Sequence, residues 1–255
     1  MTKIDALSVF FPAYKRSLQA GNKKKINLSV FFPAYNEEAH IEDTVLKAKR
    51  VLEEVADKWE IIIVNDGSKD KTGEIAKGLS ESDKRIRVIS HLPNRGYGAS
   101  LKSGFYGSRY PWIAFTDSDG QFDFSEITKF IDTQRQTGAD LAIGYYLKRQ
   151  VLLYRKLNTF LWQTVVFFLF GVRVRDIDCG FKLVSKNVID KIPRLESERG
   201  AFISSEFIIK ARKSGFKIVE VGVHHYPATR KGTGANLNVI LKSFVDLFKL
   251  WKKLR

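Results

Sequence analysis

Cysteine is almost absent from the sequence: Cys179 is the only one among 255 residues. A single cysteine excludes an internal disulfide and any zinc site built from several cysteines, and it favours a reducing, cytoplasmic location. Residues 1–14 lack the basic start, long apolar centre and small-residue cleavage site of a signal peptide. The longest uncharged run, residues 157–172, is shorter than the roughly 20 apolar residues that a spanning helix needs. We therefore expect no signal peptide and no spanning helix.

Acidic residues are scarce relative to basic ones, with 28 Asp and Glu against 43 Lys and Arg and a net charge of +15. This excess predicts an anionic partner: a nucleotide, a nucleic acid or a negatively charged membrane surface. No recognised nucleic-acid-binding motif is present, so we expect no nucleic-acid partner. The apolar share of 44% supplies enough material for a core, so a folded chain is expected rather than a disordered one.

One segment near the start occurs twice. Leu7 to Tyr14 is repeated without change at residues 28–35. Both copies look like a buried strand that ends at a proline, but only the second continues into an acidic turn and a helical pattern. We expect residues 1–25 to be an N-terminal extension, residues 26–234 to form the main domain, and residues 235–255 to form a basic amphipathic helix at a membrane interface.

Patterns typical of strands and helices alternate from residue 27 onward. The expected strands are 27–32, 60–64, 85–90, 112–115, 139–144 and 217–223. The expected helices are 37–55, 70–79, 98–110, 125–136, 151–171, 184–192, 203–214 and a last one after residue 236. Alternation with continuous apolar strands predicts an α/β fold with a mainly parallel, Rossmann-like sheet flanked by helices. Because ligands bind at the carboxyl ends of such strands, the polar turns at 33–37, 66–68, 94–98 and 117–121 should meet at one edge.

The turn after the fourth expected strand carries two carboxylates, Asp117 and Asp119. Residues i and i+2 of an extended segment point the same way, so both carboxylates can face one ion. Oxygen ligands suit Mg²⁺ or Mn²⁺, and Gln121 offers an amide oxygen. Alone, the Asp-Ser-Asp-Gly sequence is typical of an ordinary turn; the three neighbouring polar turns favour a site.

The polar motifs occur in a characteristic order. They are Phe32-Pro33-Ala34-Tyr35-Asn36-Glu37-Glu38, Val64-Asn65-Asp66-Gly67-Ser68, Asn94-Arg95-Gly96-Tyr97-Gly98-Ala99, Asp117-Ser118-Asp119-Gly120-Gln121 and the segment from Asp176 to Lys182. This ordered set resembles glycosyltransferase family 2, whose members have the GT-A fold. Within that family it is most similar to the polyprenyl-phosphate glycosyltransferases of the dolichyl-phosphate mannosyltransferase type, over about Asn27 to Gly234.

The resemblance implies a role for each motif. Donor-binding residues would be Pro33, Ala34, Tyr35, Glu37, Asp66, Arg95, Gly98, Asp117 and Arg230. Among them Asp66 would bond the base, and Asp117, Asp119 and Gln121 would hold Mg²⁺ or Mn²⁺ on the diphosphate. Lys182 would meet the acceptor phosphate. The basic loop at 230–234 departs from the family's Arg-x-x-Gly-x-Ser spacing.

These roles imply an inverting transfer of a sugar from a UDP- or GDP-linked donor to a polyprenyl (dolichyl or undecaprenyl) phosphate. A phosphate oxygen is already anionic near neutral pH, so the reaction needs no general base. The expected catalytic residues are Asp119, Lys182 and Glu206. In the alternative function, the acceptor is a glycan or another hydroxyl compound, and Glu206 is the base. Glu206 as an ordinary surface charge of a helix is also consistent with the sequence.

Other chemical groups favour structural roles. His224 and His225 directly follow the expected strand 217–223; adjacent residues of an extended segment point to opposite faces, so a structural or acceptor-side role is favoured over one shared metal. Asp176 and Asp178 form a second carboxylate pair, for which we prefer charge pairing near the acceptor pocket. Cys179 is expected to be a small buried residue rather than a nucleophile.

Two helices combine bulky apolar residues with flanking Lys and Arg: 151–171 and the C-terminal helix. Both patterns are consistent with core helices. They also suit helices that lie on an anionic membrane, which would place the chain peripherally on the cytoplasmic, inner face. Two further functions stay open: a nucleic-acid binder, opposed by the carboxylates of the edge, and an inactive scaffold, opposed by the complete Asp117, Asp119 and Gln121 set.

Overall fold

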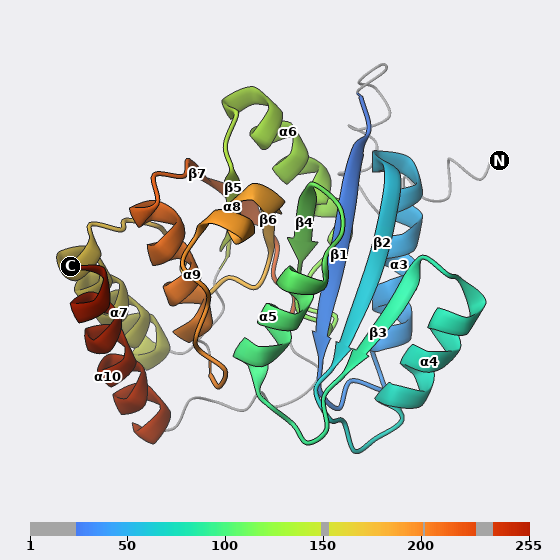
Figure 1. Cartoon of the computed structure of the whole chain (residues 1–255), viewed down its shortest axis with the longest axis horizontal. Coiled ribbons are helices and arrows are strands. Elements are labelled where there is room, and N and C mark those ends of the chain that lie inside the picture. The colour runs from blue at the N-terminus through green and yellow to red at the C-terminus, as the bar shows by residue number, and fades with distance from the viewer. Residues whose placement is uncertain (1–23, 149–152, 201, 228–236) are drawn as a thin grey trace.

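The structure is a computed structural model that describes residues 24–148, 153–200, 202–227 and 237–255 (Figure 1). The first copy of the repeated segment and Arg230 with its basic loop lie outside the described residues. The division into an extension, a main domain and a terminal helix therefore stays a prediction.

A seven-stranded sheet forms the centre of the described chain, in the order β3-β2-β1-β4-β6-β5-β7. The strands are β1 (Ile26–Ala34), β2 (Ala56–Asn65), β3 (Ile86–Ser90), β4 (Trp112–Phe115), β5 (Leu141–Tyr146), β6 (Lys182–Ser185) and β7 (Ile218–Val223). All neighbouring pairs are parallel except those of β6, which runs antiparallel to β4 and β5. The expected mainly parallel sheet is confirmed.

The strand β6 corrects the sequence-based prediction, which had only a helix over 184–192. The structure has β6 first and then the short helix α8 (Lys186–Lys191). The sequence pattern did not indicate a strand here because the strand has only four residues and begins with a lysine, a residue that is rarely buried. Here Lys182 is completely buried.

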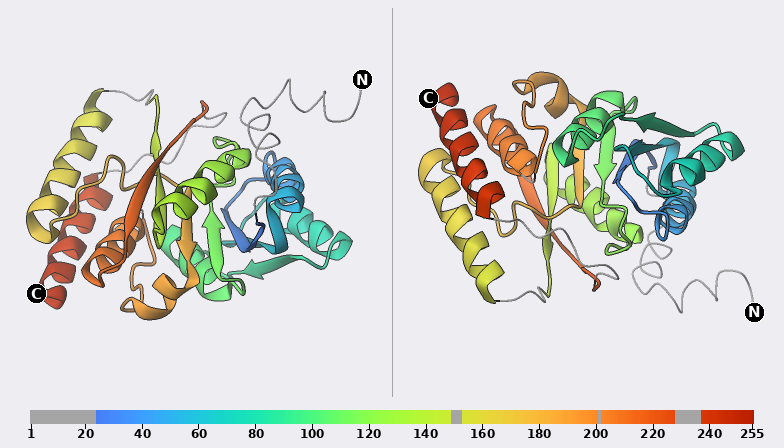
Figure 2. Two further views of the ribbon diagram at one scale, coloured as in Figure 1. Left: turned by 90° about the horizontal axis from the view of Figure 1, so that it is seen from above. Right: turned by 90° about the horizontal axis from the view of Figure 1, so that it is seen from below.

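Helices cover both faces of the sheet (Figure 2). They are α3 (Ile41–Val55), α4 (Thr72–Ser82), α5 (Tyr97–Gly107), the 3₁₀ helix η1 (Phe124–Glu126), α6 (Ile127–Thr137), α7 (Leu153–Phe170), α8, α9 (Phe202–Lys213) and α10 (Leu237–Leu254). One buried cluster joins the sheet to α3, α4 and α6. A second cluster joins the opposite face to α5, α8 and α9, and extends outward to α7 and α10.

Close packing fixes α5 against the middle of the sheet. Phe31 of β1 stacks on Phe115 of β4 with ring centroids 5.0 Å apart, and Phe105 of α5 meets Phe31 edge-on at 5.1 Å. A Cβ atom on Gly104 would lie 2.2 Å from the Phe31 ring, so this approach requires a glycine. Each buried phenylalanine contributes roughly 1.5–3 kcal/mol. This packing places the first residue of α5, Tyr97, at the carboxyl edge of the sheet.

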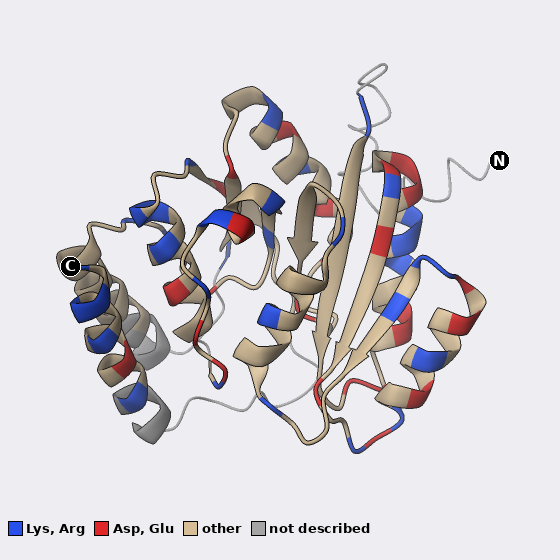
Figure 3. Ribbon diagram, viewed as in Figure 1, with Lys and Arg blue, Asp and Glu red and all other residues tan. Residues whose placement is uncertain are grey.

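Apolar side chains remain exposed on the two outer helices, which lie together at one end of the sheet (Figure 1). Phe160 and Phe168 of α7 are 64% and 78% exposed, and Phe248 of α10 is 49% exposed. Leu247 and Leu250 of α10 are buried, which confirms the amphipathic C-terminal helix. Figure 3 shows several basic residues and one acidic residue along this helix. Among the described helices, none has the length and apolar character needed to cross a membrane.

Candidate active site at the carboxyl edge of the sheet

Five polar segments meet at one edge of the sheet, as the sequence predicted for four of them. The turns after β1, β2, β3 and β4 lie there because these strands are parallel. Because β6 is antiparallel, the segment before it, residues 176–181, reaches the same edge. Ligands of α/β sheets bind at this edge.

Asp66 organises the turn after β3. Asp66 is 3% exposed, and its carboxylate accepts hydrogen bonds from Arg95 N at 2.9 Å and Gly96 N at 2.8 Å. The Nδ1 atom of His91 lies 2.6 Å from Oδ1 of Asp66, and the other ring nitrogen lies 2.8 Å from Oγ of Ser103 on α5. Asp66 therefore fixes the loop that leads into α5. Its contact with a base stays a prediction.

The turn after β3 also reaches the first carboxylate of the Asp pair. The hydroxyl of Tyr97 donates to Oδ1 of Asp117 at 3.0 Å. Burial, with the Asp117 charge, raises the pKa of Tyr97 well above its ordinary value, so the hydroxyl stays protonated. On the other side a Cβ atom on Gly180 would lie 2.3 Å from Oδ2 of Asp117. Asp117 is thus held between Tyr97 and the backbone of Gly180.

Two carboxylates close together make this site unfavourable for anions and favourable for a cation. Burial and then the neighbouring Asp119 charge raise the pKa of Asp117 from 3.8 to about 6. A divalent ion would relieve that repulsion, so the carboxylates fit the Mg²⁺ or Mn²⁺ that the sequence implies. Among the described residues no three His, Cys, Asp or Glu side chains gather to hold a metal. Further ligands would be an amide oxygen and substrate phosphates.

Gln121 joins the Asp turn to the segment after β7. Its backbone N donates to Oδ1 of Asp119 at 3.0 Å, and its Nε2 donates to the carbonyl of Tyr226 at 2.9 Å. The backbone N of Tyr226 donates a hydrogen bond of 2.9 Å to the carbonyl of Gln121. Because the amide nitrogen is engaged, Oε1 of Gln121 is the atom that would bind a metal. That role stays a prediction.

The turn after β1 lies beside the Asp turn. Ser118 Oγ donates to the carbonyl of Pro33 at 2.7 Å, and Asp66 N donates to that of Ala34 at 2.9 Å. These bonds bring three of the predicted segments together at one edge. Tyr35 is 43% exposed there, which suits a ring that would contact a nucleotide.

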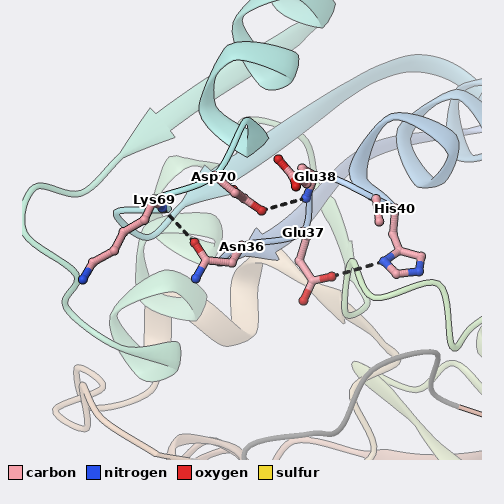
Figure 4. A pocket seen from close by; sticks show the side chains of 7 residues that line it. Asn36, Glu37, Glu38, His40, Lys69 and Asp70 are labelled. Carbon is pink, nitrogen blue, oxygen red and sulfur yellow. Dashed lines mark hydrogen bonds and ion pairs between the residues drawn. The ribbon is translucent and has the colours of Figure 1, made fainter.

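A cavity of about 610 Å³ opens next to this turn (Figure 4). It is lined by Asn36, Glu37, Glu38, Ala39, His40, Lys69 and Asp70. Glu37 N donates to Oγ1 of Thr72 at 2.8 Å, and the Glu37 carboxylate points toward His40 at 3.5 Å. The predicted donor residue Glu37 therefore lies in a hollow beside the Asp turn.

Lys182, predicted to meet the acceptor phosphate, is held inside the protein. Its side chain is completely buried, donates to the carbonyl of Cys179, and lies 5.3 Å from the centre of the Phe115 ring. Burial lowers the pKa of Lys182, and nearby carboxylates, including that of Asp117, oppose this effect. Lys182 thus supports the Cys179–Gly180 backbone under Asp117. A direct contact with an acceptor phosphate stays a prediction.

Cys179 is completely buried, as the sequence predicted. Burial raises the pKa of its thiol to about 12. The thiol therefore stays protonated at neutral pH and is a poor nucleophile.

Glu206 is not the surface charge that one interpretation of the sequence assumed. The carboxylate is buried in α9, pairs with Nζ of Lys210 at 2.6 Å, and accepts from Glu196 N at 2.8 Å and Ser197 N at 2.9 Å. Both oxygens are occupied by groups of the protein. A residue in this position supports the segment it bonds, and a role as base stays an untested alternative.

The two adjacent histidines point to different partners, as predicted. Nδ1 of His224 lies 2.6 Å from Oε1 of the buried Glu126. The ring of His225 packs against Tyr146 and Phe122, with centroids 4.5 and 5.2 Å away. Both contacts are structural.

Asp176 and Asp178 lie in the segment before β6, and Asp176 is buried. Asp178 N donates to Oδ1 of Asp176 at 3.2 Å, so this carboxylate shapes its own turn. Both carboxylates act electrostatically on Lys182 and favour its charged form. Charge pairing in this region agrees with the interpretation preferred from the sequence.

Comparison with known proteins decides the family. The family model "Glycosyl transferase family 2" matches residues 29–192, more than half of the chain. The chain belongs to glycosyl transferase family 2. The match includes the Asp turn and the segment before β6, so the family's pattern spans the edge described above.

Relatives within this family carry specific names. The dolichyl-phosphate beta-glucosyltransferase of Saccharomyces cerevisiae is 31% identical, with 67% of this chain and 58% of the yeast protein covered. The polyprenol monophosphomannose synthase of Mycolicibacterium smegmatis is 31% identical, with 64% of this chain and 65% of that protein covered. This chain thus matches less than two thirds of the length of either relative.

A solved structure confirms the fold. Glucosyl-3-phosphoglycerate synthase of Mycobacterium tuberculosis, in complex with Mn²⁺, uridine diphosphate and phosphoglyceric acid, superposes with a TM-score of 0.66. It is 19% identical, and the match covers 89% of this chain and 78% of that one. The predicted GT-A fold of a family 2 glycosyltransferase is therefore confirmed.

Several residues of the site carried no signal in the sequence. His91 follows β3 without any motif, and its contact with Asp66 depends on the tertiary fold. Tyr97 belonged to a predicted turn, but its bond to Asp117 was not foreseen. The tight fit of Gly180 could have been suspected, because a glycine in a polar segment at a sheet edge often marks a close approach.

Proposed function

We propose that this chain transfers a sugar, with inversion, from a UDP- or GDP-linked donor to a polyprenyl phosphate such as dolichyl or undecaprenyl phosphate. The observation that carries this proposal is the pair of carboxylates, Asp117 and Asp119, at the carboxyl edge of the sheet. The names of the yeast and mycobacterial relatives support the lipid-phosphate acceptor. The activity and substrates of the whole protein are part of the proposal.

Asp117, Asp119 and Oε1 of Gln121 would hold Mg²⁺ or Mn²⁺. When bound, such an ion stabilises the negative charge that develops on the departing nucleoside diphosphate. The manganese and uridine diphosphate of the mycobacterial structure support this assignment through the shared fold alone. Tyr97 and Gly180 keep Asp117 oriented toward the edge.

The donor would lie across the turns after β1, β2 and β3. Pro33, Ala34, Tyr35 and Glu37 would line the base and ribose, Asp66 would bond the base, and Arg95 and Gly98 would pass close to the sugar or phosphates. An oxygen of the acceptor phosphate attacks the anomeric carbon from the face opposite the leaving diphosphate. The new carbon–oxygen bond forms as the bond to the diphosphate breaks, so the configuration inverts.

No residue is required as base, because the attacking phosphate oxygen carries no proton near neutral pH. The geometry of Glu206 agrees with this, since both of its oxygens already accept hydrogen bonds from the protein. Transfer to a hydroxyl acceptor with Glu206 as base would first require those bonds to break. That alternative has less support than the lipid phosphate.

The exposed apolar side chains of α7 and α10 would lie on the anionic inner face of a membrane. Phe168 and Phe248 are exposed, and Lys249 and Lys252 flank the latter. Bulky apolar groups bordered by lysines bind such surfaces. A groove of about 430 Å³ between α7 and residues 172–177, lined partly by Phe160 and Phe167, would offer apolar surface to the acceptor chain.

A donor panel tests the proposed function. The protein is incubated with UDP-glucose, UDP-N-acetylglucosamine or GDP-mannose, a polyprenyl phosphate, and Mg²⁺ or Mn²⁺. We expect one donor to give a sugar-phosphate lipid whose anomeric configuration, measured by NMR, is opposite to that of the donor. Transfer only to glycans or other hydroxyl compounds would favour the alternative with Glu206 as base.

A further inference from the structure

A strap formed by residues 194–200 connects α8 to α9 and lies on the turn at the start of α5 (Figure 1). Ala99 N donates to the carbonyl of Glu198 at 3.0 Å. A Cβ atom on Gly96 would lie 2.8 Å from that carbonyl oxygen, and one on Gly98 would lie 2.7 Å from the carbonyl oxygen of Ser197. The strap therefore rests directly on the turn that carries Tyr97.

Buried charges hold the strap in place from behind. Glu206 accepts the backbone N–H groups of Glu196 and Ser197, and the completely buried Lys210 pairs with Glu206. Nζ of Lys210 also donates to the carbonyl of Arg194 at 2.6 Å. Buried charges are tolerated when each has such partners. The backbone of the strap is consequently fixed with respect to α9.

The charged side chains of the strap are nearly all paired. Glu196 bonds Lys210 and Lys253, and Glu198 bonds Arg95 at 3.0 Å and Lys102 at 2.9 Å. The guanidinium of Arg194 lies 5.4 Å from the centre of the Tyr106 ring.

Arg199 differs from these residues. Within the described part of the chain it has neither a carboxylate nor an aromatic partner, and it is exposed. Its Cγ lies 3.0 Å from where a Cβ atom on Gly96 would be. The first part of the Arg199 side chain thus packs against Gly96, the residue before Tyr97, whose hydroxyl bonds Asp117.

We infer that Arg199 recognises a phosphate group of a substrate. A guanidinium is always charged and binds phosphate through two parallel hydrogen bonds. Hydrogen bonds with Lys102 and then Arg95 lower the pKa of Glu198, so its carboxylate stays ionised. Even so, two cations, Arg95 and Lys102, contact this single carboxylate, and Arg199 follows Glu198 directly in the chain, so positive charge is in excess beside the turn. Figure 3 shows the charged tip of the strap at this place.

The fixed backbone of the strap reduces the entropy lost when Arg199 binds. The inference rests on the proposed function for the identity of its ligand: the phosphate belongs either to the nucleoside diphosphate of the donor or to the lipid acceptor. Both have the same chemistry, so the experiment must separate them.

Binding measurements on Arg199→Ala test the inference without requiring turnover. The first arm measures the dissociation constant of UDP and of GDP with Mn²⁺ by calorimetry. The second arm measures that of farnesyl phosphate, a soluble prenyl phosphate. We expect the affinity to fall about 10-fold or more in one of the arms, since a charged hydrogen bond contributes about 1.5–3 kcal/mol. Arg199→Lys, which keeps the charge but not the two-bond geometry, should give an intermediate value.

Arg194→Ala is the matched control, because Arg194 lies on the same strap and contacts Tyr106 instead of the Gly96 turn. It should bind all probes as the wild type does. A change confined to UDP or GDP assigns Arg199 to the donor, and a change confined to farnesyl phosphate assigns it to the acceptor. Dissociation constants within twofold of the wild type in both arms would overturn the inference. If the protein transfers sugar only to a hydroxyl acceptor, the proposed function is refuted. The inference about Arg199 is not refuted by that result, because the nucleotide arm still decides whether Arg199 binds a phosphate.

Discussion

The hydroxyl of Tyr97 donates a 3.0 Å hydrogen bond to Oδ1 of Asp117, and this contact connects two edge turns that are 20 residues apart in the chain. Tyr97 is the first residue of α5, and Asp117 follows β4. Since Asp66 and the strap both hold the turn before α5, the orientation of a candidate metal ligand depends on residues far from it in sequence.

Replacing Tyr97 by Phe removes only the hydroxyl. We expect kcat/KM for the donor to fall about tenfold, because losing a hydrogen bond of about 1.4 kcal/mol corresponds to that factor. Steady-state kinetics at saturating Mn²⁺ measure the change. Tyr110→Phe, in the loop between the end of α5 and β4, is the control and should behave as wild type. Equal kcat/KM values for the two variants would contradict the role of Tyr97.

The pKa of Asp117 gives a prediction about stability and pH. Burial and the charge of Asp119 raise this pKa from 3.8 to about 6, so the folded chain binds a proton more tightly than the unfolded chain does. The ionised carboxylate therefore destabilises the metal-free fold above pH 6, by at most about 3 kcal/mol. This cost diminishes as the pH falls from 6 toward 4.

Asp117→Asn tests that prediction by chemical denaturation of the metal-free protein. We expect the variant to be more stable than the wild type at pH 7.5 and similar to it at pH 4. A stability difference that stays the same at both values would show that the pKa of Asp117 is not raised. The wild type should also bind Mn²⁺ more weakly below about pH 6, since protons then compete for the carboxylate.

Gly180 allows the backbone before β6 to approach Asp117. In Gly180→Ala the new methyl group would lie 2.3 Å from Oδ2 of Asp117, so the carboxylate must move. We expect the affinity for Mn²⁺ to fall at least tenfold, measured by calorimetry. Gly78→Ala, in a helix with open space around its Cβ position, is the control. It should leave Mn²⁺ binding unchanged and stabilise the fold by about 0.5–1 kcal/mol.

Substitutions of Glu206 distinguish transfer to a lipid phosphate from transfer to a hydroxyl acceptor. If Glu206 only supports the strap, Glu206→Ala removes the closer of the two carboxylates that pair with the buried Lys210 and should lower the unfolding free energy by up to about 3–5 kcal/mol. Glu206→Gln should retain part of the activity, with a pH profile of the same shape as the wild type. A Gln variant that is equally stable but has lost turnover and the acidic limb of its pH profile would identify Glu206 as a base.

The sequence predicted the parts of the molecule that follow from local pattern. Periodicity and turn residues located most strands and helices, and the order of motifs located the Asp117 turn at the correct edge. Each of these features depends on residues that are close together in the chain.

Features that depend on tertiary burial were not predicted. Charged residues are rarely buried, so neither the burial of Lys182 nor that of the Glu206–Lys210 pair was expected. The strand β6 is short and starts with the lysine itself. The bond between His91 and Asp66 has no counterpart in the local sequence. In each case the deciding contact comes from a distant segment, and a single sequence does not reveal which segments meet.

The proposed reaction is metal-supported sugar transfer to a lipid phosphate at the Asp117 and Asp119 carboxylates. Mass spectrometry of the lipid product tests it, with wild type and Asp119→Asn each supplied with the accepted nucleotide sugar, a polyprenyl phosphate and Mn²⁺. We expect a sugar-phosphate lipid from the wild type and its loss when EDTA is added. We expect no such product from Asp119→Asn, although its thermal unfolding should match that of the wild type. Undiminished product from Asp119→Asn, or no lipid product from the wild type with any donor, would contradict it.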